Sequence, residues 1–178
     1  MITLRPAVPN DIQAIKAVVK SAFYSEAKNE VFNEWEFVEK VTQDSGYVPE
    51  LCLLAVLEDK IVGYVLLSKA KIGIHHGLAL GPIAVEPNLQ SLGIGKKLVT
   101  QSLEQAKNLG YEWVALTGGD YYLKFGFGPT EQYGIILSEN HPENTYLKIC
   151  FLEETLKNTL SGSMQFCDSF YNEKGDLL

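Results

Sequence analysis

The chain has 178 residues, which suits one domain and leaves little room for a second. Hydrophobic residues make up 46% and charged residues 21%, as in an ordinary globular protein, which excludes disordered, collagen-like and low-complexity chains. There are 15 basic and 22 acidic residues, the formal charge is -7, and Arg5 is the only arginine. Proteins that bind nucleic acid backbones usually present a basic face rich in arginine, so we expect no nucleic-acid partner.

Membrane and metal signals are absent from the sequence. No run of about 18 apolar residues occurs, and the first residues lack the cationic and apolar regions of a secretory signal. The cysteines are odd in number, form no C-x-x-C pair and lie among apolar neighbours: Cys52, Cys150 and Cys167. We interpret them as reduced core thiols rather than as disulfides, zinc ligands or a nucleophile. The sequence therefore predicts a cytoplasmic protein with no membrane contact and no metal.

The hydrophobic pattern predicts a mixed α/β fold with one continuous sheet. In the first half of the chain we expect a strand, two helices and three strands, at 2–5, 12–24, 31–41, 51–57, 61–68 and 78–85. In the second half we expect a long helix from Gly93 to Gly110, then a buried strand, a short helix and three late strands, at 113–116, 121–125, 133–137, 146–151 and 164–170. No repeat or linker divides the chain, so residues 1–178 are predicted to form a single domain.

The most informative stretch joins the strand at 78–85 to the long helix. Its loop has the pattern Gln90-x-x-Gly93-x-Gly95 and leads directly into the helix. Glycine allows a sharp turn and a close approach to a ligand. The first N–H groups of a helix have no partner inside it and, together with the helix dipole, they bind phosphate oxygens. Lys96 and Lys97 add local positive charge.

Spacing excludes two other glycine-rich loops. A Walker loop needs a glycine five residues before Gly95 and Ser or Thr after Lys96, where this sequence has Gln90 and Lys97. A Rossmann fingerprint needs a glycine at position 98, which is leucine. A glycine-rich turn that serves only helix packing is the remaining alternative.

Two motifs resemble the acetyl-CoA site of the GNAT N-acetyltransferase superfamily. One is the loop at Gln90 after a strand of the form Leu-x-x-Ile-Ala-Val-x-Pro, and the other is Tyr121-Tyr122-x-x-Phe125-Gly126-Phe127, which is similar to the family's Tyr-x-x-x-Gly-Phe. The resemblance covers about 2–151, with 152–178 as a C-terminal strand and tail that complete the sheet. It implies the GNAT fold, a central, mostly antiparallel twisted sheet flanked by helices, with a V-shaped splay beside the signature strand.

The resemblance also implies acetyl-CoA as co-substrate and assigns residues to it. The unpaired backbone of Ile83, Ala84 and Val85 would hydrogen-bond to the pantetheine arm like a missing strand neighbour, and Gly81-Pro82 would form the bulge that bends this strand. The pyrophosphate would be held by backbone N–H groups of Gln90, Ser91, Leu92, Gly93, Ile94, Gly95 and Lys96. Many members carry Asn after the next strand, whereas this chain has Thr117-Gly118-Gly119-Asp120.

Tyr122 is the predicted catalytic residue. In relatives the matching hydroxyl protonates the departing CoA thiolate, and a tyrosine with its ordinary pKa of about 10 keeps its proton at neutral pH. The alternative interpretation of Tyr122 is aromatic packing. The neighbouring Tyr121 is interpreted as a packing residue or a cofactor contact.

The general base that takes the proton from the amine is not identified. Carboxylates in the region that borders the acceptor pocket in relatives are expected to form a solvated helix face: Glu26, Glu30, Glu34 and Glu36. His75 and His76 are expected to be a satisfied or exposed pair.

The predicted reaction is transfer of an acetyl group from acetyl-CoA to a primary amine on a small molecule, by direct attack. The alternatives are a protein or peptide N-acetyltransferase and a non-catalytic acyl-CoA sensor. The surplus of carboxylates suits a cationic acceptor. Phe166, Phe170 and Tyr171 are interpreted as sheet packing. The acceptor, the acyl chain length and the oligomeric state stay open, and a homodimer that pairs or exchanges its last strands is compatible with the family.

Overall fold

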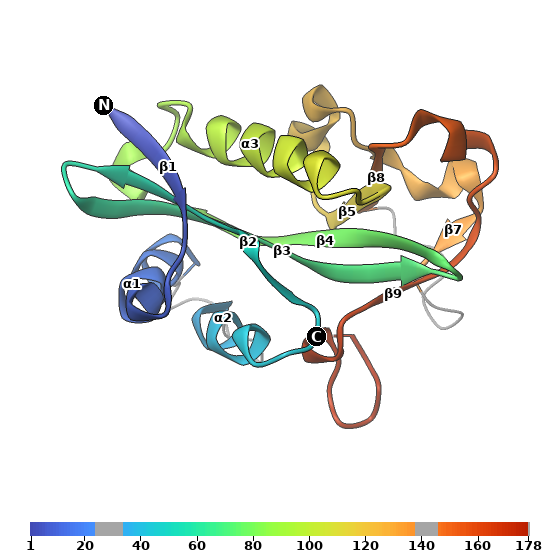
Figure 1. Cartoon of the computed structure of the whole chain (residues 1–178), viewed down its shortest axis with the longest axis horizontal. Helices are drawn as coiled ribbons and strands as arrows, with labels where there is room; N and C mark the ends of the chain where they lie inside the picture. The colour runs from blue at the N-terminus through green and yellow to red at the C-terminus, as the bar shows by residue number, and fades with distance from the viewer. Residues whose placement is uncertain (24–33, 138–145, 178) are drawn as a thin grey trace.

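The computed structural model describes residues 1–23, 34–137 and 146–177 (Figure 1). The α-helices of these residues are α1 (Ile12–Phe23), α2 (Glu34–Thr42) and α3 (Ile94–Asn108). The strands are β1 (Ile2–Pro6), β2 (Tyr47–Leu57), β3 (Lys60–Ile72), β4 (His75–Val85), β5 (Trp113–Thr117), β6 (Gly128–Pro129), β7 (Ile135–Ile136), β8 (Leu147–Phe151) and β9 (Gly162–Phe166). Short 3-10 turns join them, among them η3 (Asp120–Phe125) and η6 (Asp168–Phe170).

The sheet has the strand order β1-β2-β3-β4-β5-β8-β6. Neighbours on this path are antiparallel except β4 and β5, which are parallel. The C-terminal strand β9 pairs with the last residues of β3, from Ala70 to Ile72, beyond the point where β2 has left that strand. The mixed α/β class and the mostly antiparallel sheet predicted from the sequence are confirmed.

Helices cover both faces of the sheet, with α3 on one face and α1 and α2 on the other (Figure 1). Side chains alternate between the faces along a strand. On β2, Leu53 belongs to the buried cluster that contains Leu98 of α3, whereas its neighbour Leu54 belongs to the cluster that contains Val18 of α1 and Val38 of α2. This two-sided burial explains why β2 and β3 are apolar along most of their length.

The signature strand β4 separates from β5 soon after the two meet. They pair only at Leu78 with Val114 and at Ala79 with Ala115, after which the end of β5 pairs with β8 alone. On its other side β4 has one residue more than β3 between the pairs Val65–Ile83 and Leu67–Leu80, so the chain bulges at Gly81-Pro82. The predicted V-shaped splay and bulge are therefore present.

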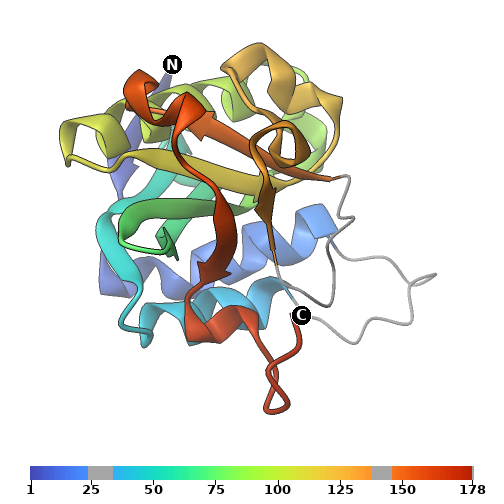
Figure 2. The same ribbon diagram turned by 90° about the vertical axis from the view of Figure 1, so that its right-hand side faces the viewer.

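Two late strands are shorter than predicted. The strand expected at 164–170 ends at Phe166. Beyond it, Ser169 is held by Asp44, whose carboxylate accepts hydrogen bonds from the Ser169 N–H at 2.8 Å and from the Ser169 hydroxyl at 2.6 Å. These bonds draw η6 into a turn beside α2 (Figure 2). Of the strand expected at 133–137 only β7 forms, because Gly134 has a positive φ of 66° that ends the preceding turn.

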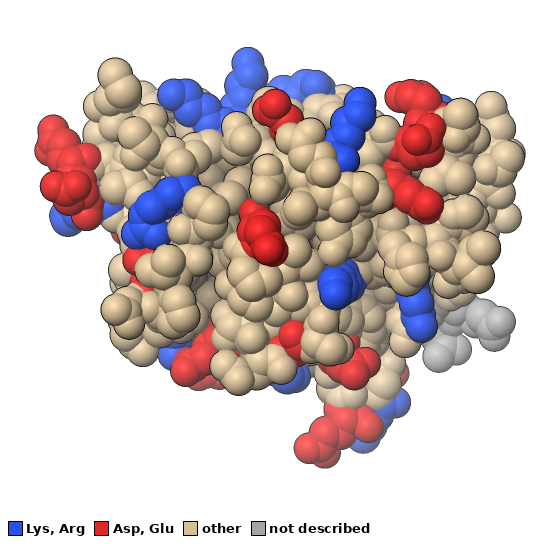
Figure 3. Space-filling view, in the orientation of Figure 1, with Lys and Arg blue, Asp and Glu red and all other residues tan. Residues whose placement is uncertain are grey.

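The face drawn in Figure 3 carries both acidic and basic side chains, with several basic side chains gathered along its upper edge. Among the described residues, no helix has the length and apolar character needed to cross a membrane.

Candidate active site

A groove of about 460 Å³ lies where the end of β4, the loop after it and the first turn of α3 face η3. The predicted cofactor residues meet here, with one exception. The groove is lined by Ile83, Ala84, Val85, Leu89, Gln90, Ser91, Gly93, Ile94, Gly95, Lys96, Tyr121 and Tyr122. Leu92 is the exception, because this residue is 69% exposed and does not line the groove.

The loop backbone shapes the mouth of this groove. Gly93, the N-cap of α3, has a φ of 84°, a left-handed conformation that glycine adopts without steric cost. The side-chain amide of Gln90 donates to the carbonyl oxygen of Val85 at 3.1 Å and so ties the loop to β4. The N–H of Lys97 donates to the carbonyl of Gly93 at 3.1 Å and closes the first turn. The N–H groups before it are those that a helix leaves without an internal partner.

Gly95 leaves room for a ligand against the helix backbone. A Cβ at this position would lie 3.7 Å from the hydroxyl of Tyr121 and 3.9 Å from Cγ2 of Val85, which are ordinary contact distances. A side chain here would therefore occupy the groove without colliding with the protein. The unpaired N–H groups, the local lysine and this space together fit the diphosphate end of a nucleotide-like cofactor.

Tyr122 on η3 packs against Gly118, the first of the two glycines that follow β5. A Cβ on Gly118 would lie only 2.7 Å from Cε2 of Tyr122, so the ring packs directly against the glycine backbone. The Tyr122 ring also meets Tyr121 edge-on, with the ring centres 5.2 Å apart, and Phe127 at 6.2 Å. Burial raises the pKa of Tyr122 above its ordinary value of 10.0, and Tyr121 adds to the shift. The hydroxyl is therefore protonated at neutral pH and able to donate a proton.

A second cavity, of about 290 Å³, lies between β4 and β5 where the strands have separated. Its walls come from both strands, from the facing ends of α1 and α2, and from the C-terminal segment. Its lining is Phe23, Glu34, Phe37, Ala79, Leu80, Gly81, Pro82, Ile83, Leu116, Thr117, Tyr122, Phe166, Phe170 and Leu177. Ile83 and Tyr122 line this cavity and the groove alike, so the two spaces meet at these residues.

The candidate carboxylates fall into three groups. Glu34 lines the second cavity, and its Oε2 atom is buried with no hydrogen-bond partner among the described residues. Its interpretation as part of a solvated face is therefore wrong. Glu36 is exposed on the same helix turn and fits that interpretation. Glu26 and Glu30 lie outside the described residues.

The two histidines are not part of this site. His75 stands at the start of β4, where its Nδ1 lies 3.0 Å from Oε2 of Glu112. His76 lines a different cavity.

Sequence reasoning missed the aromatic wall of the second cavity. Phe166 and Phe170 do pack, with ring centres 5.0 Å apart, but both also line the cavity. Phe37 joins them through an edge-on contact with Phe170 at 4.8 Å. The hydroxyl of Tyr171 accepts a hydrogen bond from the N–H of Phe166 and does not line the cavity. No local pattern marks these rings, because the contacts join α2 to the end of the chain.

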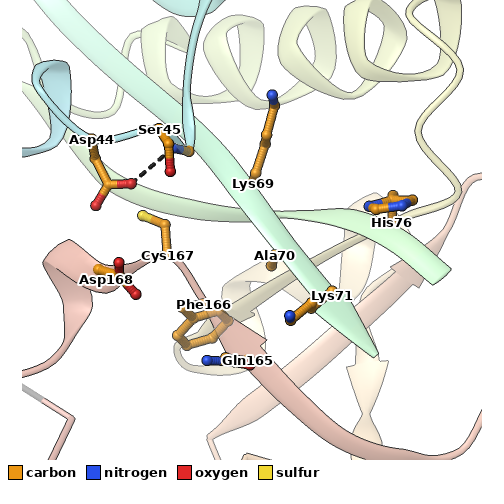
Figure 4. Close-up of a pocket in the computed structure, with 11 residues that line it drawn as sticks. Asp44, Ser45, Lys69, Ala70, Lys71, His76, Gln165, Phe166, Cys167 and Asp168 are labelled. Atoms are coloured by element: carbon orange, nitrogen blue, oxygen red, sulfur yellow. Dashed lines mark hydrogen bonds between the residues drawn. The ribbon is translucent and has the colours of Figure 1, made fainter. Parts of the chain in front are cut away.

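A third cavity, of about 200 Å³, lies beside the C-terminal end of α2 and contains Asp44, Lys69, Lys71 and Cys167 (Figure 4). Asp44 is already engaged, because it accepts from the N–H of Gly46 at 2.8 Å in addition to Ser169. Burial raises the pKa of Cys167 to about 11, and the charge of Asp44 contributes. The thiol is thus protonated at neutral pH, which agrees with its interpretation as a reduced structural cysteine.

Comparison with known proteins identifies the fold and family. The model of the Acetyltransferase (GNAT) family matches residues 13–127. The chain belongs to the GNAT family. YjhQ of Escherichia coli K12, named as an uncharacterized N-acetyltransferase, is 33% identical over 103 residues, 54% of this GNAT chain. That match spans 56% of YjhQ, little more than half its length.

Solved GNAT structures share the whole architecture. The N-acetyltransferase YhbS of Escherichia coli, crystallised with CoA, superposes with a TM-score of 0.83 at 21% identity, over 95% of this chain and 91% of that one. A GNAT acetyltransferase of Brucella melitensis, crystallised with acetyl-CoA, superposes with a TM-score of 0.77 at 24% identity, over 96% of this chain and 98% of that one. At these identities the likeness establishes the GNAT fold.

Proposed function

We propose that this GNAT protein transfers an acetyl group from acetyl-CoA to a primary amine. The observation that carries the proposal is that Ile83 and Tyr122 line the groove and the second cavity together. A cofactor in the groove and an acceptor in the cavity would therefore meet beside the Tyr122 hydroxyl. The presence of CoA in the YhbS structure and of acetyl-CoA in the Brucella structure supports the choice of cofactor.

The groove residues would hold acetyl-CoA mainly through their backbone. From Leu80 to Val85, β4 has no strand partner on the side away from β3 among the described strands, which leaves N–H and C=O groups for an extended ligand. The N–H groups at the start of α3 would bind the diphosphate, with Lys96 nearby. When bound, acetyl-CoA supplies the acetyl group as a thioester.

Tyr122 acts as the general acid in this proposal. Its burial keeps the hydroxyl protonated, so it can donate a proton to the CoA sulfur as the carbon–sulfur bond breaks. The amine nitrogen forms the new bond to the acetyl carbon and releases one proton to solvent. The Tyr122 phenolate can regain its proton from solvent before the next turnover.

A direct assay tests this function. The purified protein is incubated with acetyl-CoA and a panel of primary amines, and the acetylated amine is detected by mass spectrometry alongside free CoA. We expect equal amounts of both products with at least one amine. Binding of CoA without any acetylated product would favour the acyl-CoA sensor, and acetylation of peptides alone would favour the protein acetyltransferase. Failure to bind CoA would overturn the proposal.

A further inference from the structure

We infer that the acceptor is an amine with one positive charge on an apolar, preferably aromatic, body, and that Glu34 binds its ammonium group. This inference rests on the proposed function and names the acceptor class for the same site. It follows from the charged and apolar residues that line the cavity between β4 and β5, and from the Oε2 atom of Glu34, which has no hydrogen-bond partner among the described residues.

The described residues that line the cavity include a single carboxylate, that of Glu34. Asp, Lys, Arg and His are absent from this described lining. An acceptor that carries its own carboxylate or phosphate would leave that group without a cation, which is costly in a partly buried space. A polyamine would leave its further ammonium groups without partners. A single ammonium group matches the cavity.

The rest of the lining is apolar and rich in rings. Phe37, Phe166 and Phe170 form a connected aromatic wall, with ring centres 4.8 Å and 5.0 Å apart. Phe23 and Tyr122 also line the cavity. A ring or a short alkyl chain would lose its hydration against these side chains, and this apolar burial would contribute most of the binding free energy.

Glu34 is placed to bind the charged end. It is the first residue of α2, and Phe37 follows it at i+3, so both side chains lie on the same face of the helix. Glu34 lines the cavity, so its carboxylate can accept a hydrogen bond from an ammonium group bound there, and no described residue donates to its buried Oε2 atom. The same ammonium group would lie near the Phe37 ring, where a cation–π contact is favourable.

The helix dipole alone does not account for Glu34. A carboxylate in the first turn of a helix is favoured by the dipole, and this applies to Glu34 and Glu36 alike. Glu36 is exposed and lies outside the cavity, whereas Glu34 lines the cavity and has a buried Oε2 atom without a hydrogen-bond partner among the described residues. Glu36 is therefore a matched control for charge and helix position.

The inference is tested with three probe amines and two variants. The probes are phenethylamine, L-phenylalanine, which adds a carboxylate to the same body, and putrescine, which has two ammonium groups and no ring. Binding of each amine is measured by calorimetry with and without CoA, so that turnover is not required. We expect phenethylamine to bind at least about tenfold more tightly than the other two. In acetyl transfer its kcat/KM should be the highest by a similar factor.

Glu34→Gln keeps the shape of the side chain and removes its charge. We expect it to weaken phenethylamine binding by about tenfold or more and to raise the KM of the amine, with CoA affinity unchanged. Glu36→Gln should match the wild type in every measurement, and the melting temperatures verify that both variants fold. Wild-type affinity of Glu34→Gln for phenethylamine, or preference of the wild type for phenylalanine or putrescine, would overturn the inference. Loss of CoA binding or of all acetyl transfer would instead count against the proposed function.

Discussion

The ammonium group of Lys148 donates a hydrogen bond to the carbonyl oxygen of Gly118, at the point where β5 gives way to η3. Lys148 lies on β8 opposite Leu116 and is only 3% exposed. The Tyr122 ring packs against Gly118. Gly118 therefore contacts both Lys148 on β8 and Tyr122, the proposed general acid. We therefore expect Lys148 to position the loop that carries Tyr122, and Gly118, which departs from the family pattern, allows the ring to pack against the backbone.

Replacement of this lysine by methionine should reduce catalysis without weakening cofactor binding. Lys148→Met leaves the Gly118 carbonyl without its donor, and the loop that carries Tyr122 gains freedom. We expect kcat to fall about tenfold, the equivalent of about 1.4 kcal/mol, while CoA affinity measured by calorimetry stays the same. Lys71→Met, on an exposed position of β3, is the control. An unchanged kcat in Lys148→Met would contradict the positioning role.

A side chain at Gly95 should block the groove and leave the fold intact. Gly95→Val places methyl groups in the space beside Tyr121 without a backbone clash, because a Cβ there lies 3.7 and 3.9 Å from its nearest neighbours. We expect CoA affinity to fall about tenfold or more, with the melting temperature unchanged. Gln101→Val, at an exposed position of the same helix, controls for the helix propensity of valine. Tight CoA binding by Gly95→Val would show that the diphosphate lies elsewhere.

Removal of the Tyr122 hydroxyl should lower kcat across the pH range. Because burial and Tyr121 raise its pKa above 10.0, the hydroxyl stays protonated through neutral and mildly alkaline pH. The wild-type kcat should therefore show no decline from this group below about pH 10. Tyr122→Phe is expected to reduce kcat by about a hundredfold at each pH, with CoA affinity little changed. Tyr121→Phe removes the neighbouring hydroxyl as a control, and equal kcat losses in both variants would argue against a specific acid.

The Asp44–Ser169 contact should make stability depend on pH. Burial opposes ionisation of Asp44, but hydrogen bonds from Ser169 and Gly46 outweigh it, so its pKa lies below the ordinary value of 3.8. A carboxyl group whose pKa is lowered by folding stabilises the protein above its unfolded pKa, and this contribution is lost as the pH falls through the folded value. Asp44→Ala should therefore lower the free energy of unfolding by about 1–3 kcal/mol at neutral pH, and by less below about pH 4.

Urea unfolding at neutral pH and at about pH 3 measures this difference. Asp168→Ala is the control, because it removes an exposed carboxylate next to Ser169 and should have little effect at either pH. The same loss of stability in Asp44→Ala at both pH values would show that the ionised carboxylate is not responsible.

Local patterns in the sequence were sufficient for the groove and for most elements, apart from the ends of the late strands. The helical spacing of Leu98 and Val99 predicts α3, and glycine at position 93 supplies the left-handed cap that the structure contains. Proline at position 82 lacks the N–H of a regular strand, which predicts the bulge in β4. The groove residues come from one short stretch and from η3, so their order in the sequence reflects their arrangement in space.

The second cavity depends on contacts that no local pattern encodes. Asp44 and Ser169 are 125 residues apart, and their hydrogen bond ends β9 early and brings Phe170 against Phe37. Glu34 and Glu36 are alike in sequence, since both precede apolar residues of one amphipathic helix. Only the tertiary structure shows that one of them faces the cavity.

The separation of β4 from β5 has a consequence for how this protein can change. All residues that line the groove come from the middle of the chain, from Ile83 to Tyr122. The aromatic wall of the cavity comes instead from α2 and from the C-terminal segment. Substitutions in these outer segments would therefore reshape one compartment and spare the other. Under the proposed function, exchange of the segment after β8 between homologues would alter the choice of acceptor and leave the cofactor groove unchanged.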